Sequence, residues 1–179
     1  MDVSGDDSGE TGGQVQVTGE KVGLVHYSKI KASGKAGGGN VFIGGGFQGK
    51  DPVLKNGRIT YVGKDATIKA DAIEEGDGGQ IIVWADEATR FNGSISAKGG
   101  AQSGTGGFVE ISGKSLEYQG TIDTTALNGA AGTVLFDPTD IVVSDADETD
   151  GNGGGDILFG DTPSAEPWNV SPAQLNAVG

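Results

Sequence analysis

The stretch Gly38-Gly39-Asn40-Val41-Phe42-Ile43 decides the fold, because its pattern occurs in five copies along the chain. In each copy a glycine pair, replaced by Ala-Gly in the last, precedes apolar residues two and four positions after the second glycine. These second glycines stand at positions 13, 39, 79, 107 and 132, in steps of 26, 40, 28 and 25 residues. The sequence therefore holds a repeat of about 26 residues, with one insertion of about a dozen residues in the second copy.

Two more short apolar elements follow within the repeat. The second begins nine residues after the anchoring glycine and carries Val22 and Leu24, Leu116 and Tyr118, and Ile141 and Val143, while the third copy keeps Phe91 out of step. The third element ends the unit as Ile30-Lys31-Ala32, Ile68-Lys69-Ala70, Ile95-Ser96-Ala97 and Ile122-Asp123-Thr124. Alternation with period two predicts short strands with one buried face, separated by glycine-rich corners.

One repeat cannot bury its inward valines and isoleucines alone, whereas stacked repeats bury them against each other. Each strand then pairs in parallel with its equivalent one coil away. We therefore predict an all-β chain, a right-handed parallel β-helix (solenoid) of about five coils, with one inserted loop or hairpin and a less regular acidic C-terminal segment. An antiparallel sandwich explains the alternation but not the repeated unit. A disordered chain would not hold five copies in register.

The repeats also divide the chain into two parts. Residues 1–143 are predicted to form the β-helix, with the insertion at about 47–64. Residues 144–179 are predicted to form an acidic loop and a capping or next-coil segment. Within the insertion, Asn56-Gly57 is a hairpin signal. Near the C-terminus, Ser171-Pro172 is typical of a helix start, and such a helix would cover the open end of the solenoid.

Composition excludes several classes of function. The 179 residues include 25 acidic and 12 basic ones, for a net charge of -13, which argues against binding nucleic acid or anionic lipid. Cysteine is absent, so there is no disulfide and no thiolate chemistry. No apolar stretch has the length of a membrane span, and Met1 precedes an acidic, glycine-rich segment where a signal peptide would be basic and apolar. We therefore expect no membrane insertion, and a fragment of something larger.

Binding and metal candidates lie where the sequence departs from the repeat. The insertion is the most basic part of the chain, and insertions of repeat proteins often gather on a binding face. The binding candidates are Lys50, Lys55, Arg58, Tyr61 and Trp84, and on an outer face Trp84 could stack on a sugar ring. Trp84 alternatively packs under the insertion. The calcium candidates in the acidic segment are Asp145, Asp147, Asp150 and Asp156. Their spacing matches neither the EF-hand nor the nonapeptide calcium repeat, so we expect a solvated loop, with no metal and no other cofactor.

The same reasoning predicts that the chain is not an enzyme. A polysaccharide-acting β-helix needs paired carboxylates, or acids beside a basic residue that takes a proton. The candidate acids alternate with buried residues and are expected to point into water: Asp86, Glu87, Glu110 and Asp123. No Arg or Lys of the last two coils is expected to serve as a base beside Glu110 or Asp123. The single histidine, His26, lies near a corner of the first coil.

Several stretches together resemble the repeat region of filamentous-haemagglutinin-like exoproteins, many of them exported by two-partner secretion. The stretches are residues 37–46 (GGGNVFIGGG), 83–86 (VWAD), 93–100 (GSISAKGG), 106–113 (GGFVEISG) and 137–141 (DPTDI). The resemblance implies a secreted protein at a bacterial cell surface, with a structural and adhesive role as a rigid stalk. It also implies an outer-membrane transporter as partner during export, and a receptor or glycan on a host or neighbouring cell.

The resemblance does not extend to the family's amino-terminal secretion domain, which we do not recognise in the sequence. We therefore expect an internal or carboxy-terminal part of the stalk, either monomeric or associating end to end. Two alternatives stay open. One is a self-assembling extracellular filament subunit, and the other is a polysaccharide-acting enzyme on the same scaffold.

Overall fold

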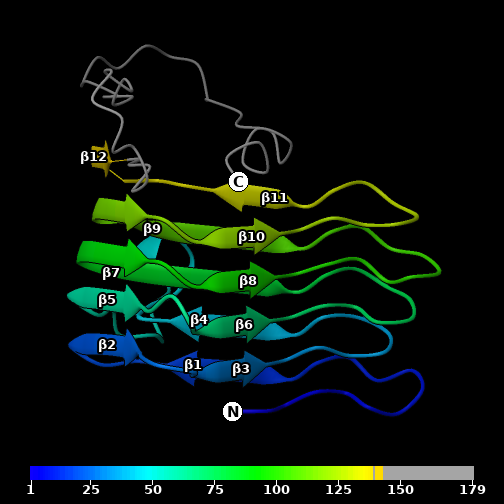
Figure 1. The fold of residues 1–179 in the computed structure, drawn as a ribbon. Coiled ribbons are helices and arrows are strands. Elements are labelled where there is room, and N and C mark those ends of the chain that lie inside the picture. Colours follow the sequence, from blue (N-terminus) through cyan, green and yellow to red (C-terminus); the bar gives the residue numbers. More distant parts are fainter. Residues whose placement is uncertain (139, 143–179) are drawn as a thin grey trace, which may run out of the picture.

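The computed structural model describes residues 1–138 and 140–142, and every strand pair within them is parallel. The strands stack in chain order along one axis, beginning from the N-terminal side (Figure 1). Their bounds are β1 (Gln14–Val17), β2 (Lys21–Leu24), β3 (Lys29–Lys31), β4 (Asn40–Ile43), β5 (Ile59–Val62), β6 (Thr67–Lys69), β7 (Gln80–Phe91), β8 (Ser94–Ser96), β9 (Phe108–Tyr118), β10 (Thr121–Asp123), β11 (Thr133–Leu135) and β12 (Asp140–Val142), with one 3₁₀ turn, η1 (Phe47–Gly49).

The parallel β-solenoid predicted from the repeats is confirmed. Each coil contributes three strand segments, and in the third and fourth coils β7 and β9 merge the first two segments into one bent strand. The described residues form four full coils, and β11 and β12 begin a fifth by pairing with β9. The sequence did not indicate that residues 2–5 also pair in parallel, with Lys31 and Gly34, and extend the sheet of β3 by a further strand-like segment.

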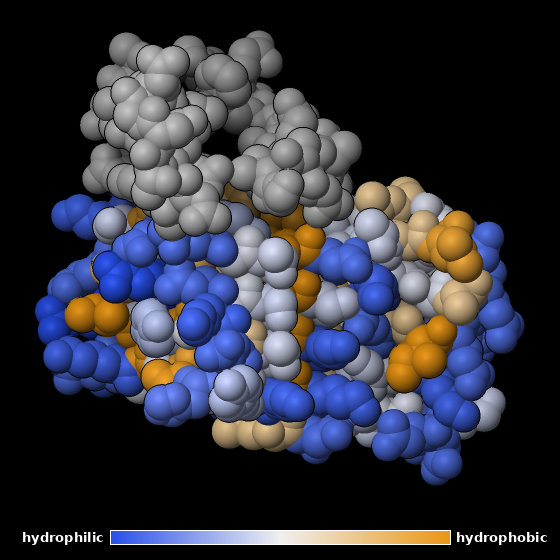
Figure 2. Space-filling view, viewed as in Figure 1, coloured by the Kyte–Doolittle hydropathy of each residue, from blue (hydrophilic) through white to orange (hydrophobic). Residues whose placement is uncertain are grey.

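Inward side chains stack in ladders with one residue per coil. Val41, Ile81 and Val109 form one such ladder, and Ile30, Ile68 and Ile95 form another. Each of these side chains is at most 3% exposed, and burial of a valine or isoleucine contributes about 1.5–3 kcal/mol. The face shown in Figure 2 is mostly hydrophilic, with apolar side chains in separate patches. The ladders therefore form one continuous core along the solenoid axis.

The glycine pairs are required by the stacking of the coils. The N–H of the second glycine closes the corner of its own coil with a hydrogen bond to a backbone carbonyl. Gly79 donates to the carbonyl of Ala70 and Gly107 donates to that of Ala97, both at 2.7 Å. The first glycine lies against the corner bond of the next coil, because a Cβ on Gly78 would collide with the Ala97 carbonyl and lie 2.5 Å from the Gly107 nitrogen. No side chain fits at Gly38, Gly78 or Gly106 without displacing backbone.

A register shift explains why Phe91 was out of step in the sequence. Ala85 of β7 pairs with Gly113 and Ala88 pairs with Ser115, so β7 holds one extra residue at this bend. Beyond the shift the ladder resumes, and Phe91 stacks on Tyr118 with ring centroids 5.8 Å apart. The irregularity is a β-bulge that bends the strand around the corner of the coil.

The insertion is shorter than predicted and contains no hairpin. Ile59–Val62, which we had included in it, forms β5 and completes the second coil by pairing in parallel with β2 and β7. Asn56-Gly57 therefore leads into a coil strand and does not join two antiparallel ones. The extra residues are 44–58, called the strap below, and they contain η1. Strand β5 was missed because its inward position holds Thr60, a polar residue whose hydroxyl donates to the Trp84 carbonyl at 2.6 Å.

Among the described residues no helix is long and apolar enough to cross a membrane. The predicted acidic segment, its calcium candidates and the helix start at Ser171 lie outside the described residues.

Candidate binding surface

The strap is fastened to the third coil by Trp84, which lies half-buried beneath it. The indole ring packs against Gly45 and Gly49, where an added Cβ would lie 2.8 and 2.5 Å from ring atoms. The indole N–H donates to Asp86 Oδ1 at 3.0 Å, and the Asn56 amide donates to the same oxygen at 2.9 Å. Of the two positions expected for Trp84, an outer binding face or packing under the insertion, the structure shows the second: the ring packs under the strap. The sequence signal was the glycine run that leaves room for the ring.

The other binding candidates lie on the strap and on the strand that follows it. Lys50 and Lys55 are exposed on the strap, and the Lys50 ammonium donates to the Gln48 side-chain oxygen at 2.9 Å. Arg58 pairs with Glu87 at 2.9 Å and with Glu20 at 3.7 Å, so its charge is already partnered.

Tyr61 faces outward from β5, in register with Arg90 of the next coil. Tyr61 and Arg90 line a shallow depression of about 290 Å³. Arg90 is ion-paired there with Glu117 at 2.7 Å. The structure therefore brings Tyr61 beside a charged pair on the strand face, while Lys50 and Lys55 are carried by the strap.

Glu110 is not where the sequence reasoning placed it. Its position on β9 does alternate with inward Val109 and Ile111, but the strap covers it and its exposed fraction is 0%. The backbone N–H of Gln48 donates to both carboxylate oxygens, at 3.2 and 3.1 Å. The sequence did contain a sign of this burial in Ile82 on β7, which pairs in register with Glu110. An apolar residue at an outward position indicates that another segment covers that face.

Burial sets the electrostatics of Glu110. Removal from water disfavours its charged form and raises the pKa of this carboxyl above its ordinary value, and Asp137 acts in the same direction. Hydrogen bonds from Gln48 and Ser112, and the charge of Lys50, act in the opposite direction but do not cancel the effect of burial on the pKa.

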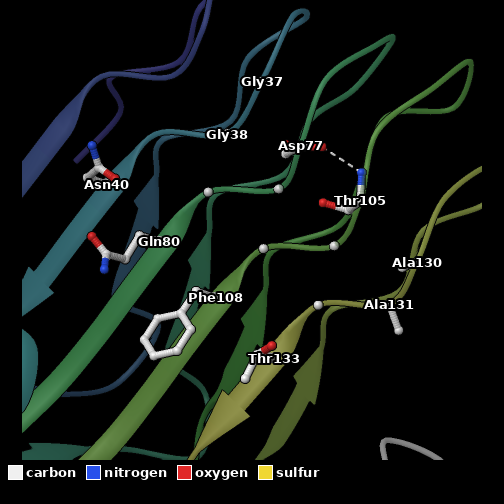
Figure 3. Close-up of a pocket in the computed structure, with 15 residues that line it drawn as sticks. Gly37, Gly38, Asn40, Asp77, Gln80, Thr105, Phe108, Ala130, Ala131 and Thr133 are labelled. Carbon is white, nitrogen blue, oxygen red and sulfur yellow. Dashed lines mark hydrogen bonds between the residues drawn. The ribbon is translucent and has the colours of Figure 1, made fainter.

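A second hollow runs along the corner where the glycine pairs turn into the first strand of each coil (Figure 3). It is shallow, about 670 Å³, and one side chain per coil lines it in register: Asn40, Gln80, Phe108 and Thr133. The N–H groups of the paired glycines along it donate to carbonyls of the same or the next coil, so they are not available to an anion. What remains for a ligand is amides, hydroxyls, an aromatic ring and the exposed Asp77 carboxylate, which accepts from the Thr105 N–H at 2.7 Å. Such a lining suits polar molecules such as sugars.

The remaining candidate acids are already engaged in contacts. Asp86 accepts from Trp84 and Asn56, and Glu87 pairs with Arg58. Asp123 lies on the other sheet, where it accepts from Thr125 at 2.7 Å. Among residues 1–138 and 140–142, no three His, Cys, Asp or Glu side chains gather as a metal site would require. His26 is exposed at a corner with a left-handed φ of 53°.

Comparison with known proteins finds similarity to a solved structure. No family model matches the sequence, and no curated protein matches it. The chain is similar to the crystal structure of the HMW1 secretion domain from Haemophilus influenzae, with a TM-score of 0.58 and 29% sequence identity over 74% of this chain and 35% of that chain. The chain thus matches about a third of the solved domain's length. The similarity supports a β-solenoid segment of a secreted protein. Because the matched structure is a secretion domain, the comparison does not support our expectation that the chain lies outside such a domain, and placement in the stalk stays a prediction.

Proposed function

We propose that this chain is a structural and adhesive segment of a large secreted exoprotein at a bacterial cell surface, a rigid β-helical stalk that presents binding surfaces. The observation that carries the proposal is the repetition of one stacking geometry from coil to coil: the same parallel ladders, corner bonds and inward columns recur through all four coils. Such a fold lengthens by adding coils and needs no new kind of contact. The similarity to a solved secretion domain supports the secreted setting.

Stiffness follows from the way the coils are joined. Backbone hydrogen bonds join each coil to the next along three strand segments and again at the glycine corner. Bending the rod therefore requires several of these hydrogen bonds to break at once. The net charge of -13 keeps such a rod soluble and discourages aggregation. The proposal assigns no catalysis to the chain.

Partners follow from the same proposal. An outer-membrane transporter acts during export of the parent protein, which the filamentous-haemagglutinin-like resemblance implies and the secretion-domain similarity supports. A receptor or glycan on a host or neighbouring cell binds at the exposed strap lysines, Lys50 and Lys55, or on the outer strand face at Tyr61. Tyr61 lies on strand β5, a rigid element of the stalk, which favours precise recognition there.

The test is adhesion by beads that carry the purified 179-residue chain. Beads are measured for binding to epithelial cells, bacterial cells and immobilised glycans. Lys50→Ala with Lys55→Ala removes two charges from the strap. Lys29→Ala with Lys69→Ala removes two exposed charges from the other sheet as a matched control. We expect the strap variant to bind severalfold less than the wild type and the control to bind equally. Wild-type beads that bind no surface of the panel would contradict the adhesive role.

A further inference from the structure

The strap extends from the second coil over the third and fourth coils and covers the buried side chain of Glu110. It leaves the second coil after β4, packs on Trp84 of the third and contacts the fourth at two points. One contact is the edge of Phe47 against Phe108, with ring centroids 5.7 Å apart. The other is the N–H of Gln48 on the Glu110 carboxylate. Closure of the strap is therefore what removes Glu110 from water.

The part of the strap that binds Glu110 is conformationally strained. Gln48 has a left-handed φ of 51°, which is uncommon for a residue with a side chain. Its neighbour Gly49 also has a positive φ, at 62°. A strained residue of this kind persists only while its surroundings hold it. The bond from Gln48 to Glu110 and the packing of Gly49 on Trp84 hold it here.

Every charged or polar group facing Glu110 has a definite effect on its two protonation states. On the strap, the Gln48 N–H and the Lys50 ammonium favour the carboxylate, as does the Ser112 hydroxyl on β9. Asp137, which follows β11, disfavours it. Burial also disfavours it and is the largest contribution to the raised pKa. An open strap would return the carboxyl to water, where the ionised form is favoured.

We propose that the strap is a proton-linked clasp, in which residues 44–58 close over Glu110 together with uptake of a proton and open when the proton leaves. The direction follows from linkage: below the pKa of the open form, pH has no effect on the opening equilibrium. Between the open-state pKa and the higher closed-state pKa, the opening constant rises about tenfold per pH unit, and above both it is constant again. Opening exposes Glu110 and Trp84 and displaces Lys50 and Lys55, so the clasp changes the surface that carries the strap's charges. This inference does not depend on the proposed function.

The first test is hydrogen exchange of the full chain from pH 4 to pH 8. The probes are the strap amides of Gly49 and Lys50, which donate to Gly46 and Phe47, and their rates are corrected for the intrinsic effect of pH. We expect the opening constant to rise severalfold with pH in the wild type. In Glu110→Gln it should be independent of pH, whereas Glu75→Gln, a change at an exposed corner, should behave as the wild type. A flat wild-type profile, or the same rise in Glu110→Gln, overturns the proposal.

The second test uses the reciprocal effect and needs no change at Glu110. Gly49→Ala places a methyl against the Trp84 ring at a residue with positive φ, so it opens the strap. Gly9→Ala has the same kind of φ, 82°, but no atom within 4 Å, and is the matched control. Carbon NMR of the Glu110 carboxyl should show a lower pKa in Gly49→Ala than in the wild type, and an unchanged one in Gly9→Ala. An equal Glu110 pKa in all three proteins contradicts the clasp.

Discussion

Replacing Gly78 by alanine tests whether the glycine pairs are required by coil stacking. The added methyl would lie 2.5 Å from the Gly107 nitrogen and 2.6 Å from the Ala97 carbonyl carbon. These two residues form the corner bond of the next coil, with 2.7 Å between nitrogen and oxygen. The methyl therefore enters a backbone hydrogen bond between two rigid segments, and neither side is a flexible side chain that can move away.

The expected cost has two parts. Loss of a net hydrogen bond at the corner is about 0.5–1.5 kcal/mol. Forcing a methyl into packed backbone is about 1–3 kcal/mol. Gly78→Ala should therefore lower the free energy of unfolding by about 1.5–4.5 kcal/mol. For a chain of this size, that lowers Tm by about 3–18 °C.

Gly23→Ala is the matched control, because Gly23 is an exposed strand glycine whose added Cβ meets its nearest atom, Val25 Cγ1, at 3.8 Å. Alanine there should leave stability unchanged or raise it by about 0.5 kcal/mol. Thermal and urea unfolding by circular dichroism measure both variants. Equal stability of Gly78→Ala and Gly23→Ala, within about 0.5 kcal/mol, would refute the claim that stacking excludes a side chain at the pair.

Three further predictions concern the core. Phe91→Ala removes a fully buried ring stacked on Tyr118 and should cost about 3–5 kcal/mol in urea unfolding, and a loss under 1 kcal/mol would contradict the ladder. Thr89→Val removes the buried hydroxyl that donates to the Ser112 carbonyl at 2.7 Å and should cost about 1–3 kcal/mol, and no loss would show that the hydroxyl contributes nothing. Burial raises the pKa of Tyr118 to about 12, so alkaline titration by absorbance should show one tyrosine ionising late, and the stability due to its neutral form is lost as pH rises from about 10 to about 12.

Much of the fold followed from local rules that the sequence displays openly. The spacing of the glycine pairs gave the unit, and alternation at Val41 and Ile43 gave the inward face. Ile81-Ile82-Val83 broke that alternation, and the structure gives the reason: Ile82 faces outward yet is fully buried under the strap. The strap's position over Glu110 depends on contacts between segments 62 residues apart, which no local pattern encodes.

The elements that were missed share a different cause. Thr60 and Thr89 occupy inward positions where hydrophobicity alone predicts an aliphatic residue, and each is accommodated because its hydroxyl donates to a backbone carbonyl. The extra residue between Ala85 and Ala88 shifted Phe91 out of the expected spacing. A pattern read by fixed spacing therefore loses strands wherever a buried polar side chain finds a partner or a bulge adds a residue.

The in-register stacking of coils is the claim on which the rest depends, and disulfide formation measures it directly. The chain has no cysteine of its own. Lys31 and Lys69 pair in register on adjacent coils, where the strand spacing of about 4.8 Å suits a disulfide. Lys31 and Ser96 lie two coils apart, at about twice that spacing, which is too far. Oxidation of the full chain should close the disulfide quantitatively in Lys31→Cys with Lys69→Cys, and leave Lys31→Cys with Ser96→Cys reduced. A disulfide in the second pair, or none in the first, would contradict the stacked parallel solenoid.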